Sequence, residues 1–194
     1  MTCVIGLVDD ELGVIMGADS AGSDGHRIST YKAPKVWRRE CQAGVFLFGV
    51  AGSYLPMQVM RHNFDPPRVV ERQDLDEYMV SEFVPALRKA LSDVGCEGKD
   101  GAEASMGAGN MLVGFRGRLF EIQSNFTVLE SGKGFMAIGS GIDYAMGCLY
   151  GNEASLGGMA RVKQALGCAE SFVTTVRGPF TIDTLEVANG NDRG

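Results

Sequence analysis

The chain begins with two apolar segments separated by a short acidic turn, and this pattern constrains the fold more than any other feature. Thr2 to Val8 and Gly13 to Asp19 are apolar along nearly their whole length, and Asp9 to Glu11 lies between them. Two such runs joined by a turn predict a β-hairpin. Because the runs are continuous rather than alternating, they also predict a sheet that is covered on both faces.

Groups of strands and groups of helices alternate along the rest of the chain. Residues 44–50 predict a further buried strand, a helical pattern follows over 54–64, and a second helical pattern begins at Asp74. Pro85 lies within that second pattern and predicts a kink or a break. The polar, glycine-rich segment 97–108 predicts an exposed loop.

The remaining elements are expected in a fixed order. The expected strands cover 26–31, 35–40, 110–114, 117–123, 126–130, 135–138 and 180–187. One further helix is expected after residue 141, and another over about 158–176. No internal repeat or linker interrupts this order. The sequence therefore predicts one domain over residues 1–194, of class α+β, with helices outside paired sheets.

Composition excludes several classes of function. The net charge is −6 and the basic residues are dispersed, which argues against nucleic acid as a partner. No apolar run approaches the roughly 18 residues that span a bilayer, so we expect no membrane partner. The five cysteines are scattered without CxxC spacing and no secretory signal is evident, so we expect reduced thiols in a cytoplasmic protein. With two histidines in the chain, we expect no zinc site, and we expect no cofactor.

Thr2 is the candidate nucleophile. A small residue after Met1 normally permits removal of that methionine, and a threonine with a free α-amine carries a hydroxyl nucleophile and a base in one residue. Asp19 ends the second apolar run and Lys35 lies at the end of the following segment, so antiparallel pairing would bring both beside Thr2. Taken alone, Asp19 could cap a turn and Lys35 could be a solvated edge-strand lysine.

Two alternatives remain open from the residues alone. Lys32 competes with Lys35 for the role of the catalytic lysine. Cys3 would become the nucleophile if two residues were trimmed, although it is more readily interpreted as a core strand residue.

Five segments together resemble the proteasome β-subunit family, which includes the bacterial HslV peptidase. They are Thr2 to Val8, Gly17-Ala18-Asp19-Ser20, Pro34-Lys35-Val36, Ala51-Gly52-Ser53 at the head of a helix, and Ala137-Ile138-Gly139-Ser140-Gly141 before Tyr144-Ala145. The opening and the Asp-Ser turn are most similar to the small proteasome-like hydrolases of bacteria and their phages. The resemblance implies the four-layer αββα sandwich of the N-terminal-nucleophile hydrolases.

The resemblance also implies a role for each matching residue. Thr2 Oγ would be the nucleophile, and its α-amine would be the base. Lys35 would lie close to the hydroxyl, and Asp19 would hold Lys35 charged and in position. The Gly52 N–H would donate to the oxyanion, and Ser140 would complete the hydrogen bonds around the amine.

Substrate contacts follow from the same resemblance. Ser23 would mark the segment that pairs with an extended peptide, and Val50 and Tyr54 would line a specificity pocket for an apolar side chain. The family carries an Asp-x-x-Ser pair near the C-terminal helix, whereas residues 171–178 of this chain have hydroxyl residues and no aspartate. An arginine that is frequent two places after the aspartate is Ala21 in this chain.

The implied function is a self-compartmentalising threonine peptidase that acts on unfolded polypeptides or peptides. Such a protein would assemble as a homo-oligomeric ring or double ring, with an ATP-dependent unfoldase as a possible partner. Two alternatives use the same fold: a catalytically silent structural or assembly subunit, and an amidase of small molecules.

Overall fold

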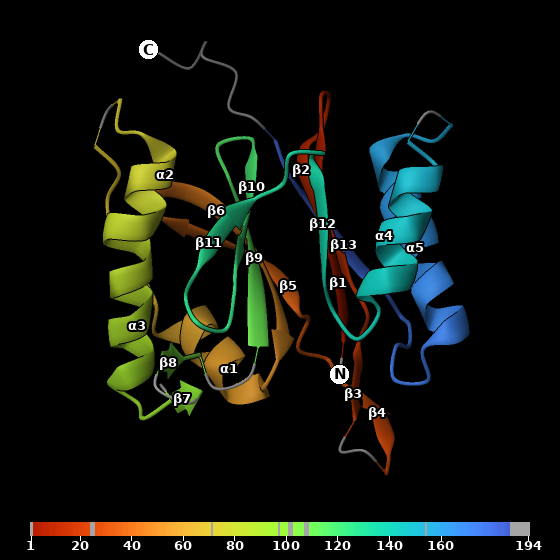
Figure 1. Cartoon of the computed structure of the whole chain (residues 1–194), viewed down its shortest axis with the longest axis horizontal. Coiled ribbons are helices and arrows are strands. Elements are labelled where there is room, and N and C mark those ends of the chain that lie inside the picture. Colours follow the sequence, from red (N-terminus) through yellow and green to blue (C-terminus); the bar gives the residue numbers. More distant parts are fainter. Residues whose placement is uncertain are drawn as a thin grey trace.

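The computed structural model describes residues 2–23, 26–70, 72–96, 98–100, 103–106, 109–153 and 155–186. Two antiparallel sheets form its centre (Figure 1). The first has the order β12-β1-β2-β13, with β12 Phe135–Gly139, β1 Cys3–Asp9, β2 Gly13–Ala18 and β13 Thr181–Leu185. The second has the order β11-β10-β9-β6-β5, with β11 Val128–Glu130, β10 Arg118–Ile122, β9 Gly109–Phe115, β6 Gly44–Gly52 and β5 Val36–Cys41.

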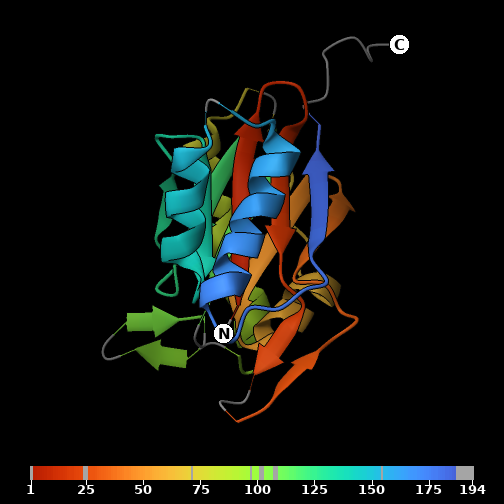
Figure 2. The ribbon, with the colours of Figure 1, turned by 90° about the vertical axis from the view of Figure 1, so that its right-hand side faces the viewer.

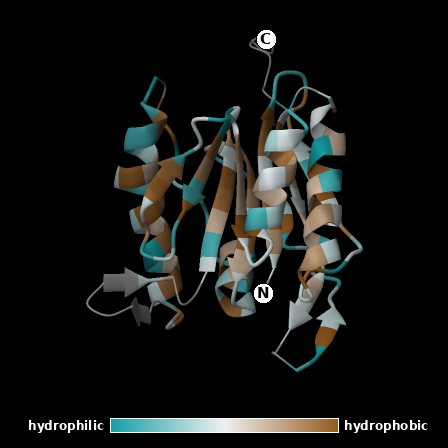
Figure 3. Ribbon diagram, turned by 45° about the vertical axis from the view of Figure 1, so that its right-hand side comes forward, coloured by the Kyte–Doolittle hydropathy of each residue, from teal (hydrophilic) through white to brown (hydrophobic). Residues whose placement is uncertain are grey.

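The two sheets pack face to face through a shared apolar layer. Its fully buried members include Val4, Val14, Met16, Leu47 and Leu112, which come from both sheets. Figure 3 shows the most hydrophobic colouring in these central strands and more mixed colouring on the outer helices. The continuous apolar runs are therefore explained, because the strands contact the other sheet on one side and helices on the other.

Helices cover the outer face of each sheet. On the first sheet lie α4 Ile142–Gly151 and α5 Gly158–Phe172, which run side by side across the strands (Figure 2). On the second sheet lie α1 Tyr54–His62, α2 Leu75–Tyr78, the π-helical turn η1 Met79–Phe83 and α3 Val84–Ser92. The second helical layer packs on a cluster of aromatic rings that includes Phe46, Phe48, Phe83 and Phe115.

The expected mixture of strands and helices is confirmed, including the N-terminal hairpin. β1 and β2 pair from Val4 opposite Ala18 to Asp9 opposite Gly13. Asp74 caps α2 by accepting hydrogen bonds from two backbone N–H groups of the first turn. Pro85 does not split the helical segment: α2, η1 and α3 follow one another without a gap, with right-handed helical angles at Phe83 and Val84, and Pro85 lies in the first turn of α3.

Two expectations were wrong in detail. The segment expected as an exposed loop contains a short hairpin, β7 Gly98–Asp100 with β8 Glu103–Ser105, and Met106 after it is buried in the aromatic cluster. Residues 97, 101–102 and 107–108 of that segment lie outside the described residues. The last helix ends at Phe172 rather than near 176, and the β-branched run Val173 to Val176 that follows disfavours helix.

A second short hairpin lies near the end of β2. It pairs β3 Ala21–Ser23 with β4 Ile28–Thr30, and β4 falls within the strand expected over 26–31. None of the helices in the described ranges is long and apolar enough to cross a membrane.

Candidate active site

The N-terminal hairpin brings Thr2 next to Asp19. Cys3, which follows Thr2, is joined to Asp19 by two hydrogen bonds. Cys3 N donates to Asp19 Oδ1 at 2.9 Å, and Asp19 N donates to Cys3 O at 3.2 Å. Both Thr2 and Asp19 are buried, at 3% and 1% exposure. Thr2, the candidate nucleophile, and Asp19, the carboxylate expected to hold Lys35, therefore lie at the same end of one hairpin.

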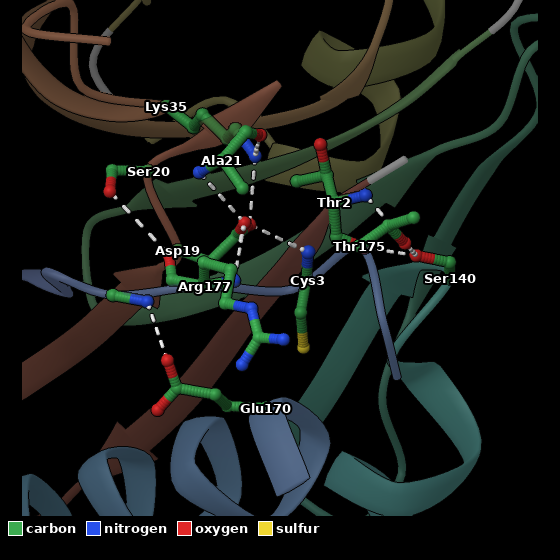
Figure 4. A network of polar contacts seen from close by, with 11 residues as sticks. Thr2, Cys3, Asp19, Ser20, Ala21, Lys35, Ser140, Glu170, Thr175 and Arg177 are labelled. Carbon is green, nitrogen blue, oxygen red and sulfur yellow. Dashed lines mark hydrogen bonds and ion pairs between the residues drawn. The ribbon is translucent and has the colours of Figure 1, made fainter. Parts of the chain in front are cut away.

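Asp19 is the centre of a buried polar network, shown in Figure 4. Its carboxylate accepts four hydrogen bonds, three from backbone N–H groups and one from a lysine. The donors are Cys3 N at 2.9 Å, Ala21 N at 3.0 Å, Arg177 N at 3.4 Å and Lys35 Nζ at 2.8 Å. These four donors give each oxygen of the buried carboxylate two hydrogen bonds.

Lys35 forms the ion pair that the sequence led us to expect. Its ammonium donates to Asp19 Oδ1 at 2.8 Å and to Ala21 O at 2.5 Å, and the residue is 3% exposed. Burial lowers the pKa of Lys35 below its ordinary value, and the Asp19 carboxylate opposes that shift. Lys32 is exposed, and the ion pair with Asp19 is formed by Lys35.

Ser140 lies against the backbone of Thr2. Thr2 N donates to Ser140 Oγ at 3.2 Å, and Ser140 Oγ lies 3.3 Å from Thr2 O. Ser140 Oγ also lies 3.3 Å from Thr175 Oγ1. When Ser140 gives its one hydroxyl proton to Thr2 O, Thr175 is the donor to Ser140. The two hydroxyls thus hold the Thr2 nitrogen in a fixed position.

The segment after α5 supplies the other side of the network. Arg177 N donates to Asp19 Oδ2, and Arg177 O accepts from Ser20 N at 3.0 Å. The next residue, Gly178, donates its N–H to Glu170 Oε1 on α5 at 2.9 Å. Glu170 therefore ties the end of α5 to the segment that contacts Asp19.

A cavity of about 290 Å³ opens beside Thr2. It is lined by Thr2, Ala51, Gly52, Gly109, Asn110 and Gly139. Gly52 and Gly139 have φ angles of +142° and +94°, which an L side chain rarely adopts. At Gly139 a Cβ atom would lie 2.2 Å from Thr2 O, so glycine is required for the close approach of β12 to Thr2.

An apolar pocket adjoins this cavity and shares two lining residues with it. It is lined by Val50, Ser53, Pro56, Met60, Met106, Gly109, Asn110 and Met111. The pocket has a volume of about 10 Å³, which is space for about one water molecule. Val50, which was expected in a specificity pocket, is among its lining residues.

Tyr54 and Ser23 are placed differently from Val50. Tyr54 is not among the residues that line the apolar pocket; its ring lies edge-on to Tyr31, with the centroids 5.2 Å apart. Its hydroxyl is buried without a hydrogen-bond partner in the described part of the chain. Ser23 is half-buried at the end of β3, opposite Ile28 of β4.

The Cys3 thiol is unsuited to act as a nucleophile. It is fully buried in the layer between the first sheet and α4 and α5. Burial first, and the nearby Asp19 carboxylate second, raise the pKa of Cys3 to about 12. Since the thiolate is the reactive form, this thiol is inert at neutral pH.

Sequence reasoning missed several contributors to the site. In the sequence, Thr175 is one of several hydroxyl residues within 171–178. In the structure, Thr174 is exposed and Ser171 donates to a carbonyl of its own helix, so Thr175 is the one that contacts Ser140. Asn110 lines both hollows, and its amide is held by Glu121 Oε1 at 2.7 Å. No local sequence motif marks Asn110, because its position beside the cavity depends on how β9 pairs within the second sheet.

No protein-family model matches the chain, and no curated protein matches it. Among solved structures, BPH from Thiobacillus denitrificans is 20% identical with a TM-score of 0.77, covering 96% of this chain and 98% of that one. HslV from Trypanosoma brucei is 18% identical with a TM-score of 0.64, covering 95% and 99%.

The chain has the fold of HslV and the proteasome-like β-subunits. Anbu, the ancestral β-subunit, from Yersinia bercovieri supports the same conclusion at 16% identity and a TM-score of 0.66, covering 95% of this chain and 81% of that one. A further structure contains the Thiobacillus denitrificans protein in complex with epoxomicin. At these identities the likeness establishes the fold, and the function must be argued from the site.

Proposed function

We propose that the protein is a threonine peptidase of the N-terminal-nucleophile type, built as a four-layer αββα sandwich in one domain over residues 1–194. One observation carries the proposal: Thr2 adjoins a buried Lys35–Asp19 ion pair and lines a cavity of about 290 Å³ together with Gly52. A buried charge pair is costly unless it is fully hydrogen-bonded. A buried pair beside a cavity is typical of a functional site, which supports the proposal.

The free amine of Thr2 would act as the base. After removal of Met1, the nitrogen that donates to Ser140 Oγ becomes an α-amine with an unperturbed pKa of roughly 7.7–8.0. The positive charge of Lys35 nearby disfavours a second positive charge, so the amine is largely neutral at neutral pH. It can then accept the proton of the Thr2 hydroxyl, directly or through a water molecule.

The reaction proceeds through an ester. Thr2 Oγ attacks the carbonyl carbon of the peptide bond, and its proton passes to the amine. The Gly52 N–H donates to the oxyanion that forms, an interaction that in other enzymes contributes about 3 kcal/mol. The proton then passes from the amine to the departing nitrogen of the substrate, the C–N bond breaks, and water hydrolyses the ester to restore Thr2.

Substrate positioning follows from the hollows beside Thr2. An extended peptide would pair with the backbone near Ser23, and the side chain next to the cleaved bond would enter the apolar pocket floored by Val50, Met60 and Met106. Because that pocket has space for about one water molecule, a small apolar side chain fits without rearrangement. Larger side chains require the flexible methionines to move.

Assembly into a homo-oligomeric ring or double ring would restrict the site to unfolded polypeptides. The fold supports this proposal, and one of the structural neighbours, Anbu from Pseudomonas aeruginosa, is described as a helical assembly. We further propose a cytoplasmic location and delivery of substrates by an ATP-dependent unfoldase.

Hydrolysis of fluorogenic peptides tests the proposal. Peptides with alanine before the scissile bond should be cleaved by the wild type and by Thr2→Ser, and left intact by Thr2→Ala. Met60→Ala should improve cleavage after leucine or phenylalanine relative to alanine. Turnover of small amides without peptides would favour an amidase, and a protein that carries a free Thr2 amine but turns over neither would be a silent subunit.

A further inference from the structure

Two cysteines meet where α4 and α5 pack together on the outside of the first sheet. Cys148 lies in α4 and Cys168 in α5, and both are free, half-buried thiols. Cys168 lies close enough to Cys148 to raise the pKa of its thiol. Neither residue belongs to the network around Thr2.

The register of the two helices explains why these thiols face each other. Tyr144 of α4 stacks on Phe172 of α5, with the ring centroids 5.0 Å apart. Arg161, near the other end of α5, donates to the carbonyl oxygen of Leu149 at 3.0 Å. These two contacts fix the helices as antiparallel neighbours, as Figure 2 also shows. One turn on from Tyr144 lies Cys148, and one turn back from Phe172 lies Cys168, so both fall on the shared seam.

We propose that Cys148 and Cys168 form an intramolecular disulfide on oxidation by a peroxide, and that this bond locks the C-terminal end of α5 against α4. Half-burial leaves the pair within reach of a small oxidant such as hydrogen peroxide. Adjacent packed helices also allow the short Cα separation that a disulfide requires.

The chemistry balances with hydrogen peroxide as the oxidant. Burial raises the pKa of the Cys148 thiol, and the neighbouring Cys168 thiol raises it further, so Cys148 keeps its proton. Peroxide oxidises the Cys168 sulfur to a sulfenic acid, and the second peroxide oxygen leaves as water with the thiol proton. The Cys148 sulfur then attacks that sulfur, the S–S bond forms, and the sulfenic hydroxyl leaves with the Cys148 proton as water.

The disulfide would act on the site through both helix ends. Ser140 lies two residues before the start of α4, and Glu170 lies two residues after Cys168. Glu170 holds Gly178 N, and the segment before Gly178 brings Thr175 to Ser140. Fixing Cys168 to α4 makes local opening of this segment more costly.

Peptide mapping tests the disulfide directly. Trypsin separates the two cysteines, because Cys148 lies in peptide 134–161 and Cys168 in peptide 164–177. After treatment of the full-length protein with hydrogen peroxide, the non-reduced digest should contain these two peptides linked, with the loss of two hydrogen atoms. Reduction with dithiothreitol should release them.

Variants separate this pair from the other thiols. Cys148→Ser and Cys168→Ser should each abolish the linked peptide, and Cys148→Ser should leave a sulfenic acid on Cys168 that dimedone traps. Cys41→Ser removes another half-buried thiol and should leave the link intact. A digest in which both thiols remain free, or in which either is linked elsewhere, overturns the proposal.

Hydrogen exchange tests the lock without reference to catalysis. In the oxidised protein the amides of Val176 and Gly178 should exchange more slowly than in the reduced protein. The Cys148→Ser variant, treated in the same way, should show no slowing. Equal exchange in oxidised and reduced wild type would refute the lock. Because neither readout uses substrate, both results stand whether or not the protein is a peptidase.

Discussion

Gly139→Ala should displace Thr2 and disable the site while leaving the fold in place. Gly139 lies opposite Cys3 in the β1–β12 pairing, at a φ of +94°. An alanine Cβ at this position would lie 2.2 Å from Thr2 O and 2.8 Å from Thr2 C. These are backbone atoms, so no side-chain rotation relieves the overlap.

The size of the effect follows from these distances. Ordinary contact begins at 3.4 Å, so β12 and Thr2 must separate by about 1.2 Å. A displacement of about 1 Å at a reacting group can lower its rate on the order of 100-fold. The positive φ adds roughly 1–2 kcal/mol of strain, and the overlap adds about 1–3 kcal/mol.

Gly134→Ala is the matched control. Gly134 has a φ of +71°, close to that of Gly139, but a Cβ there would meet nothing nearer than Val8 Cβ at 3.9 Å. This variant should therefore incur the strain of the backbone without moving Thr2. We expect it to lose roughly 1–2 kcal/mol of stability and to keep the wild-type reactivity of Thr2.

The assay combines urea denaturation with the rate at which an epoxyketone probe labels Thr2. Gly139→Ala should be destabilised more than Gly134→Ala and labelled about 100-fold more slowly than the wild type. If both variants are labelled at the wild-type rate, the close approach of β12 does not position Thr2, and this reasoning fails.

Three further predictions concern the polar network. Asp19→Asn should cost about 3–5 kcal/mol in urea denaturation, because it leaves the buried Lys35 ammonium without its counter-charge; a loss below about 1 kcal/mol would class the pair with surface ion pairs. Thr175→Val should lower stability by about 1 kcal/mol and slow labelling of Thr2, since Ser140 loses a hydroxyl partner, and an unchanged labelling rate would exclude that role. Because the pKa of Cys3 is raised from 9.0 to about 12, the stability it contributes should be complete below pH 9 and lost as pH rises to 12; a Cys3→Ala variant measured alongside should lack this loss, and parallel curves would contradict the raised pKa.

Local pattern was sufficient for most of the fold. The apolar runs of β1 and β2 and the helix after Ser53 each follow from short segments of sequence. The hairpin within 97–108 escaped because its residues are polar and glycine-rich, a composition shared by loops and exposed strands.

The site was predictable to the extent that its residues lie on the N-terminal hairpin or on a distinctive motif. Asp19 could be placed beside Thr2 because it ends the segment that pairs with β1. Lys35 could be placed there because it ends the segment that follows. Asn110 and Thr175 could not, since each reaches the site through tertiary packing of elements far away in the sequence. The orientation of the Tyr54 ring could not be foreseen either, because it depends on contact with Tyr31, which is distant in the sequence from α1.

Intact mass of the purified protein, before and after reaction with an epoxyketone, tests the central claim most directly. We predict a mass that lacks Met1, and one covalent adduct that maps to Thr2 and is absent from Thr2→Ala. A protein that keeps Met1 and forms no adduct would contradict the claim that Thr2 is the nucleophile.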